Sequence, residues 1–330
     1  MLPVVTKPMK TTTTVEDALA KLTARYGDKA SDYIEGAAVR RELTYDDYIK
    51  VDTLLSIQQP LTDFHDELTF MIYHQQTELW FRLILHEMRY GIEHLLAEPA
   101  DLPKAMQSVQ RTNRILGHLT ESFDVLIEGL STDEFMGFRK AFGTSSGFQS
   151  AQFRAIEILA GLDRKSIKGQ DNTFYWERAA RDKETGEPTL TLITFKEKHL
   201  SWLNQMYEKR EPRSLRYAFE KIISQKLGIK ATSPQQFYEI FYSSNNEELL
   251  RLANELLQLD ELIIGWKIAH LRSAAKHLAK APRGTGETNW AEYLTKSIAE
   301  ERCFPELYLA KKEMEKEEEE EVESVTLADA

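Results

Sequence analysis

Residues 70–80 read Phe70-Met-Ile-Tyr-His74-Gln-Gln-Thr-Glu-Leu-Trp80 and lie inside a longer stretch, residues 66–96, with a regular apolar pattern. Its apolar positions are Phe70, Ile72, Leu79, Phe81, Leu85, Met88, Ile92 and Leu95. This spacing predicts a long amphipathic helix with a broad apolar face. A helix of this kind is stable when that face is buried against other elements, and the rest of the chain offers mainly helices for it.

The same helical periodicity recurs along the chain. Helices are expected over residues 104–128, 150–160, 197–207, 214–225, 234–241, 247–280 and 290–298. Ser131 and Glu134 have capping-box spacing and predict a further helix that ends at Gly143. Gly and Pro are few, at 15 and 10 residues, which suits long helices better than a many-turned β architecture. The sequence predicts an all-α fold in a single large helical domain.

Composition divides the chain into three regions. Residues 1–42 form an N-terminal extension with short helices, residues 43–310 the main helical domain, and residues 311–330 an acidic tail. From Lys311 to Glu323 there are eight Glu and three Lys, a net charge of −5, so we expect a solvated tail and leave its order open. Residues 163–190 are polar and predict a surface excursion that could hold a small hairpin.

Composition also excludes several classes of protein. The net charge of −11 argues against a general nucleic-acid-binding surface. No run of 18 apolar residues predicts a membrane span, and the N-terminus lacks the apolar core of a signal peptide. Cys303 is the only cysteine, so a disulfide within the chain and a cysteine zinc cluster are excluded. A cytoplasmic location is therefore expected.

Phe70 and His74 form the first candidate binding pair. They stand at i and i+4, so both side chains project from one face of the predicted helix. An aromatic ring beside an imidazole suits a flat heteroaromatic ligand, with His74 hydrogen-bonding a ring N–H. The alternative is a core phenylalanine beside a satisfied histidine, which is the commoner case for either residue taken alone.

Arg139 and the segment that follows it form the second candidate. Residues 143–147 read Gly-Thr-Ser-Ser-Gly, and Ser146 with Gln149 has capping-box spacing. Such a turn can hold the Arg139 guanidinium against a ligand carboxylate in a bidentate pair. The alternative is an ordinary surface ion pair, which contributes little energy.

His270 and the loop after its helix form the third candidate. Imidazole is a common haem-iron ligand. His270 and His277 lie seven residues apart on one helix face, so periodicity does not decide between them as ligand. The loop Arg283-Gly-Thr285-Gly286 offers one hydroxyl, although it lacks the Gly-Lys-Ser/Thr ending of a P-loop.

These segments, in this order, resemble the tryptophan 2,3-dioxygenase family over about residues 43–310. Its most specific match is Ser145-Ser-Gly-Phe-Gln-Ser150 with Gln152-Phe-Arg154. The stretches Leu43-Thr-Tyr45-Asp-Asp-Tyr48 and Leu54-Leu-Ser-Ile-Gln-Gln-Pro60 are similar to the start of the family domain. The resemblance implies an all-helical homotetramer that holds haem b and uses O₂ as co-substrate.

The resemblance also implies roles for individual residues. Those expected to bind substrate are Phe70, His74, Phe135, Arg139, Thr285, Tyr45 and Tyr48. Those expected to hold haem are His270, as the iron ligand, with Ser146 and Gly147. His74 is the expected catalytic residue, through orienting the indole N–H, and Arg139 is expected to pair with the substrate carboxylate. Tyr45 and Tyr48 would enter the pocket of a neighbouring subunit.

Two departures from the family pattern concern substrate choice. Phe135 stands where the family usually has Tyr, and Gly284-Thr-Gly-Glu-Thr-Asn-Trp290 replaces a more glycine-rich loop. The expected activity is oxidative opening of the indole ring of L-tryptophan to N-formylkynurenine. The departures leave two alternatives: a haem monooxygenase acting on tryptophan or a substituted tryptophan in secondary metabolism, or a helical binding protein without catalysis.

Overall fold

The structure, a computed structural model of the chain, describes residues 14–39, 43–164, 173–182, 185–209, 214–228, 246–279, 281 and 289–328. Within these ranges the regular elements are helices, and extended backbone pairs only in isolated bridges such as that between Arg181 and Pro188. The predicted all-α fold is confirmed. The helix expected at residues 234–241 lies outside the described residues.

The chain divides into two compact units, Met1–Gln58 and Gln59–Ala330. The described helices of the first unit are α1 (Val15–Tyr26), η1 (Gly27–Lys29), α2 (Ala30–Val39), α3 (Tyr45–Ile49) and α4 (Val51–Ser56). Thr14 and Thr44 begin α1 and α3 with complete capping boxes. The boundaries predicted near residues 42 and 310 remain predictions.

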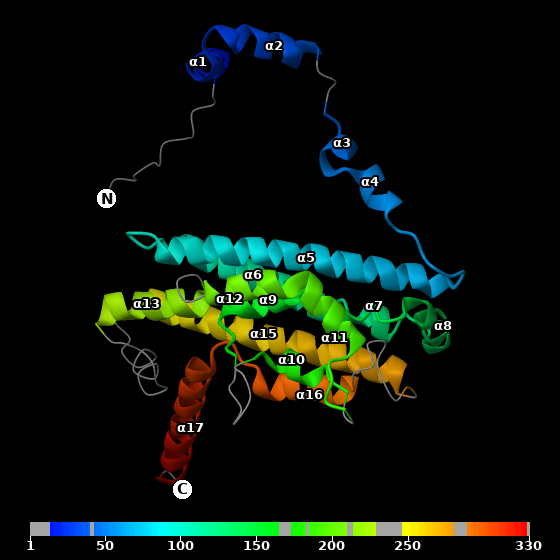
Figure 1. The fold of residues 1–330 in the computed structure, drawn as a ribbon. Helices are drawn as coiled ribbons and strands as arrows, with labels where there is room; N and C mark the ends of the chain where they lie inside the picture. Colours follow the sequence, from blue (N-terminus) through cyan, green and yellow to red (C-terminus); the bar gives the residue numbers. More distant parts are fainter. Residues whose placement is uncertain are drawn as a thin grey trace. The chain divides into compact units, whose positions relative to one another are not determined.

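Three long helices form the centre of the second unit: α5 (His65–Leu96), α6 (Leu102–Glu121) and α15 (Glu247–Leu278). In Figure 1 they run lengthwise beside one another, and α6 contacts both α5 and α15. The interior is built from large apolar side chains that are almost fully buried, including Phe81, Ile84, Leu116 and Leu256. Their burial, at about 2 kcal/mol for each large side chain, fixes the frame on which the site is built.

The second unit has further helices among the described residues. They are α7 (Asp124–Ile127), α8 (Thr132–Phe138), η2 (Arg139–Phe142), η3 (Gly147–Gln149), α9 (Ala151–Ala160), α10 (Tyr175–Ala179), α11 (Leu190–Phe195), η4 (Lys196–Leu200), α12 (Ser201–Glu208), α13 (Leu215–Leu227), α16 (Trp290–Glu300) and α17 (Pro305–Ala328). The helix expected over residues 104–128 is interrupted at Ser122 and Phe123, where α6 ends and α7 begins.

The start of α8 differs in part from its predicted capping box. Ser131 does cap the helix, since its side chain accepts a hydrogen bond from Glu134 N. The Glu134 carboxylate instead accepts from Asp66 N at 2.9 Å, and Asp66 accepts from Ser131 N at 2.8 Å. Because α5 also has unsatisfied N–H groups in its first turn, the two acidic side chains tie α5 and α8 together.

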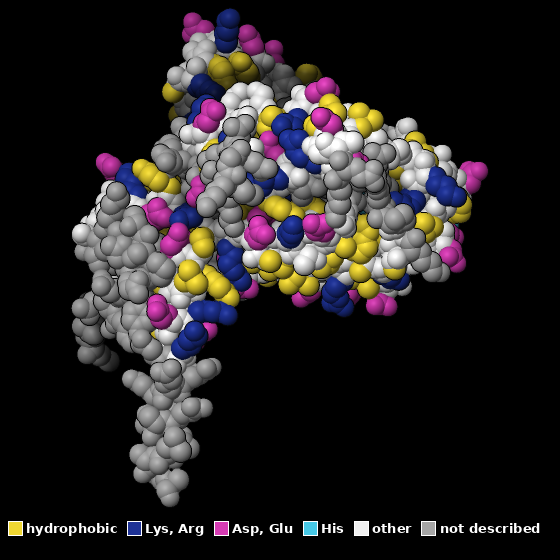
Figure 2. All heavy atoms as spheres, turned by 60° about the horizontal axis from the view of Figure 1, so that its bottom comes forward, with side chains coloured by type: hydrophobic (Ala, Val, Ile, Leu, Met, Phe, Trp, Pro, Cys, Tyr) yellow, Lys and Arg dark blue, Asp and Glu magenta, His cyan; other side chains and the backbone are white. Residues whose placement is uncertain are grey.

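The acidic C-terminal segment is helical. α17 continues to Ala328, and Glu and Lys are among the better helix formers. On the face in Figure 2, described Lys and Arg side chains are interspersed with Asp and Glu and with hydrophobic side chains. Among the described residues, no helix combines the length and the apolar character needed to cross a bilayer.

Candidate functional site

A cavity of about 180 Å³ brings together six of the residues that the sequence singled out. They are Phe70, His74, Phe135, Ser146, Gly147 and His270. A second cavity of about 420 Å³ is lined by five of the six, all except His270, and adds Glu67 and Ser145. The two cavities therefore share walls, and residues from α5, α8, η3 and α15 meet around one space.

His74 is held in a defined orientation by its own helix. Its ring packs on Phe70 with a centroid distance of 4.1 Å, as the i, i+4 spacing predicted. His74 Nδ1 lies 2.7 Å from the Phe70 carbonyl oxygen, so Nδ1–H donates and Nε2 carries the free lone pair. Burial lowers the pKa of His74, which keeps the ring neutral. The neutral ring is a hydrogen-bond acceptor at Nε2.

Aromatic rings form the wall beside His74. Phe70 lies 5.7 Å from Phe135 and 5.4 Å from Phe142, measured between ring centroids. Phe135 is 8% exposed, and no hydroxyl group occupies its position. This wall suits a flat apolar ring, because aromatic pairs favour offset and tilted contacts at these distances.

The Ser-Ser-Gly segment forms the turn that the sequence predicted. The Ser146 side chain accepts a hydrogen bond from Phe148 N, and Gln149 Oε1 accepts from Ser146 N at 3.2 Å, which completes the capping box. Gly147 faces the imidazole of His270: a Cβ built on Gly147 would lie 3.9 Å from its Nε2. The missing side chain leaves the space in front of that ring open.

Gly143-Thr-Ser145-Ser-Gly147 also matches the Gly-x-Ser-x-Gly pattern of hydrolase nucleophile elbows. That motif requires a strand before the serine and a helix after it. Here the serine follows the short helix η2, with Gly143 at a φ of 57°, and no strand precedes it in the described residues 43–164. The structural context does not support a hydrolase.

His270 and His277 differ in their hydrogen bonds. His277 Nε2 donates to the Leu126 carbonyl oxygen at 2.9 Å, and Nδ1 lies 3.3 Å from Thr132 Oγ1, so both nitrogens are engaged. The described residues offer no hydrogen bond to the ring of His270. Burial is the main cause that lowers the pKa of His270 to about 4; repulsion from a protonated His74 and from Arg154 acts in the same direction. Its ring is neutral and has a lone pair available.

The linings of these cavities do not test the roles predicted for four further binding residues. Arg139 lines neither one; its guanidinium carbon lies 6.0 Å from the Phe135 ring centroid. Tyr45 and Tyr48 belong to the first unit and are exposed, at 74% and 75%. Thr285 lies outside the described residues. Their predicted roles stay predictions.

The cavity also contains residues that sequence reasoning missed. Glu78 lines both cavities and accepts a hydrogen bond from Gln152 Nε2 at 2.8 Å. It stands four residues after His74, so the spacing that linked Phe70 to His74 could have found it. Trp290 and Tyr293 line the smaller cavity from α16. No local sequence pattern predicts Trp290 and Tyr293 as cavity residues, because only tertiary packing brings α16 to the cavity wall.

A family model and individual relatives both relate this chain to one family of proteins. Residues 32–233 match the sequence model of a family described as tryptophan 2,3-dioxygenase. Relatives of that name include proteins of Caulobacter vibrioides, 31% identical over 81% of this chain and 97% of the relative, and of Saccharopolyspora erythraea, 31% identical over 84% and 94%. The Xanthomonas campestris relative is 32% identical over 81% of this chain and 86% of its own length.

Proposed function

Because the chain belongs to the tryptophan 2,3-dioxygenase family, we propose that it opens the indole ring of L-tryptophan oxidatively to N-formylkynurenine, using haem b and O₂. One observation carries this proposal: two imidazoles line the same aromatic cavity. His270 is neutral and has no hydrogen-bond partner among the described residues, and His74 is an acceptor at Nε2.

The residues present fit a haem group. His270 offers a neutral imidazole, which is the form that binds iron. Gly147 leaves space in front of that ring, where any larger residue would project a side chain. In the described residues no three His, Cys, Asp or Glu side chains converge as a metal site, so iron on His270 would need a macrocycle for its other ligands. Ser146 and Gly147 would flank that macrocycle.

Haem iron supplies O₂ binding and activation when it is bound. The chain itself supplies orientation. Phe70 and Phe135 give a flat indole ring apolar surface, and His74 Nε2 accepts a hydrogen bond from the indole N–H. Holding the ring in one orientation contributes to the rate without proton transfer, so His74 need not act as a general base.

The amino-acid end of the substrate needs groups outside the described cavity walls. Arg139 would pair with the carboxylate, and Thr285 would meet the ammonium group. Tyr45 and Tyr48 would reach the pocket of a neighbouring subunit in a homotetramer, which is consistent with their high exposure in the single chain. We also propose a cytoplasmic location, since the lone cysteine suits a reducing compartment.

Haem ligation is tested with two histidine variants. His270→Ala is expected to lose tight haem binding and the native Soret band, because it removes the available imidazole. His277→Ala is expected to keep the band, since both nitrogens of His277 are already engaged. A native band in His270→Ala together with its loss in His277→Ala would move the ligand to His277 and contradict the assignment.

The reaction itself is tested by product mass. Ferrous haem-loaded protein, with tryptophan and ¹⁸O₂, is expected to give a product that carries two labelled oxygen atoms and to need no added reductant. Addition of one oxygen, or a need for reductant in every turnover, would favour the monooxygenase. A purified protein that stays colourless after haem supplementation would favour the non-catalytic binding protein.

A further inference from the structure

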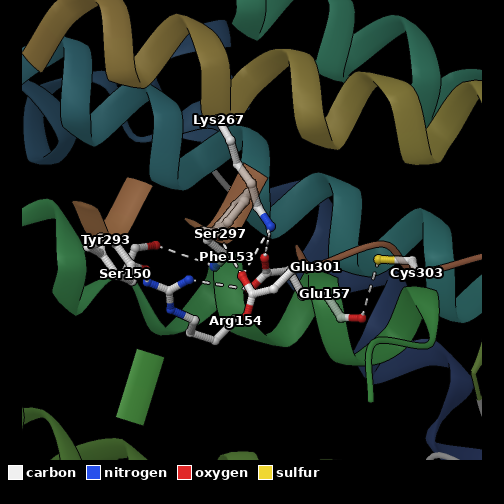
Figure 3. A network of polar contacts seen from close by, with 9 residues as sticks. All are labelled: Ser150, Phe153, Arg154, Glu157, Lys267, Tyr293, Ser297, Glu301 and Cys303. Atoms are coloured by element: carbon white, nitrogen blue, oxygen red, sulfur yellow. Dashed lines mark hydrogen bonds and ion pairs between the residues drawn. The ribbon is translucent and has the colours of Figure 1, made fainter. Parts of the chain in front are cut away.

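A network of buried charges lies beside His270. Arg154 and Glu157 come from α9, Lys267 from α15, and Glu301 follows the last residue of α16, as Figure 3 shows. Their exposed fractions are 5%, 1%, 2% and 4%, so all four are almost completely removed from water. Two cations and two carboxylates balance, which offsets the large penalty of burying each ion.

The contacts join three helices. Lys267 Nζ lies 2.7 Å from Glu157 Oε1 and 3.3 Å from Glu301 Oε2. Arg154 Nη1 lies 3.3 Å from Glu157 Oε2, and Arg154 Nη2 donates to the hydroxyl of Tyr293. Although burial acts against the charge of Lys267, the two carboxylates outweigh it and raise its pKa. Lys267 is therefore cationic at neutral pH. Burial raises the pKa of Glu301, and the charge of Lys267 opposes that rise.

A small cavity connects this network with His270. It has a volume of about 30 Å³, enough for one water molecule. Its polar lining comes from Ser150, Arg154, Lys267, Tyr293 and Ser297, and His270 is part of the same lining. Ser297 also donates to Glu301 Oε2 at 2.5 Å, so the cavity wall and the carboxylate are directly linked.

Trp266 lines the same cavity, and its buried indole N–H has no acceptor among the described residues. His270 is likewise without a hydrogen-bond partner from the described residues. A histidine that binds a metal through one nitrogen almost always donates its other N–H to a carboxylate, a carbonyl or a water. A water in the cavity would accept hydrogen bonds from both rings.

We infer that the Arg154–Glu157–Lys267–Glu301 network positions His270, through a water in the 30 Å³ cavity, and sets the charge around the iron ligand. The inference rests on the proposed function, because it assumes haem on His270. Lys267 stands one turn before His270 on α15, so its contacts to α9 and to the end of α16 also fix the rotation of that helix. All members of the network are positioning residues.

The test uses Glu301→Gln in the haem-loaded protein. The amide is nearly isosteric and leaves Lys267 paired with Glu157, but it removes one negative charge from the surroundings of His270. The midpoint reduction potential of the haem is expected to rise, since lost negative charge stabilises the ferrous state. Glu300→Gln, an exposed neighbour on α16, makes the same chemical change and is expected to leave the potential at the wild-type value.

An unchanged or lowered potential in Glu301→Gln would overturn the inference. If Glu301→Gln fails to fold, Ser297→Ala tests the inference instead, because it removes a hydroxyl group from the 30 Å³ cavity without changing charge. The Fe–His stretching frequency of Ser297→Ala is expected to lie below that of the wild type; an unchanged frequency would overturn the inference. The wild type is measured first: absence of an Fe–His band there rejects ligation by His270, and thus the proposed haem site, rather than the role of the network.

Discussion

The aromatic cavity and the charge network meet at His270, but they are built in different ways. The cavity wall includes several Phe rings and neutral imidazoles, and its main pair, Phe70 and His74, comes from one helix. The network holds four buried charges from three segments that are far apart in the sequence. The aromatic cavity depends on local spacing and the charge network on tertiary packing. Substitutions in the cavity should therefore mainly affect substrate binding, and substitutions in the network should mainly affect stability.

The largest expected effect on stability is in the network. Lys267→Met leaves Glu157 and Glu301 without their shared cation, and breaking a buried ion pair in this way costs about 3–5 kcal/mol. Urea unfolding measures the loss. Lys296→Met is the matched control, because Lys296 forms an exposed i, i+4 pair with Glu292 and should contribute less than about 1 kcal/mol.

The double variant Lys267→Met/Glu301→Gln sharpens this test. It removes the carboxylate that Lys267→Met leaves unpaired, so it is expected to recover part of the lost stability. If Lys267→Met and Lys296→Met lower the free energy of unfolding by the same small amount, the network does not stabilise the fold. The contrast in stability between the network and the aromatic cavity would then be wrong.

The contrast between local spacing and tertiary packing also explains which features could be predicted from the sequence. Periodicity of three and four residues was sufficient for α5, α9 and α15, and for the shared face of Phe70 and His74. Capping-box spacing predicted the Ser146 turn, and the resemblance to a family implied His270 as the iron ligand. Each of these depends on short-range spacing or on a motif, and the structure brings them into one cavity.

Other features could not be predicted from local sequence. In the sequence, Lys267 cannot be distinguished from a surface lysine, because its partners come from α9 and from the end of α16. Glu134 matched a local capping box, but a tertiary contact with Asp66 competed for its carboxylate. Periodicity did not distinguish His270 from His277. The hydrogen-bond partners that engage both ring nitrogens of His277 come from α7 and α8, so only tertiary packing reveals this difference.

The next largest expected effect is on substrate binding and concerns Arg139. Arg139→Ala is expected to raise KM for tryptophan about tenfold to a hundredfold, because a hydrogen-bonded charge pair contributes about 1.5–3 kcal/mol. Steady-state kinetics measures it. Arg139→Lys keeps the charge but loses the bidentate geometry, so an intermediate KM is expected. An unchanged KM in Arg139→Ala would mean that Arg139, which lines neither cavity, does not reach the substrate.

The smallest expected effect lies at the rim of the 420 Å³ cavity, where Glu67 is 1% exposed. Its carboxylate accepts hydrogen bonds from Leu61 N at 2.6 Å and Thr62 N at 2.8 Å, and from the Thr62 hydroxyl. Burial opposes ionisation, but these bonds outweigh it and lower the pKa of Glu67. Glu67→Gln is expected to lose about 1–2 kcal/mol at neutral pH, because an amide presents one acceptor oxygen instead of two.

The pH dependence of this loss follows from the direction of the pKa shift. A carboxylate with a lowered folded-state pKa contributes fully above its unfolded value of 4.5, and the contribution is lost as pH falls through the folded pKa. The stability difference between wild type and Glu67→Gln should therefore be constant near neutrality and shrink below about pH 4.5. Urea unfolding at a series of pH values measures it. A difference that stays constant down to pH 3 would show that Glu67 stabilises the rim by packing and not by its charge.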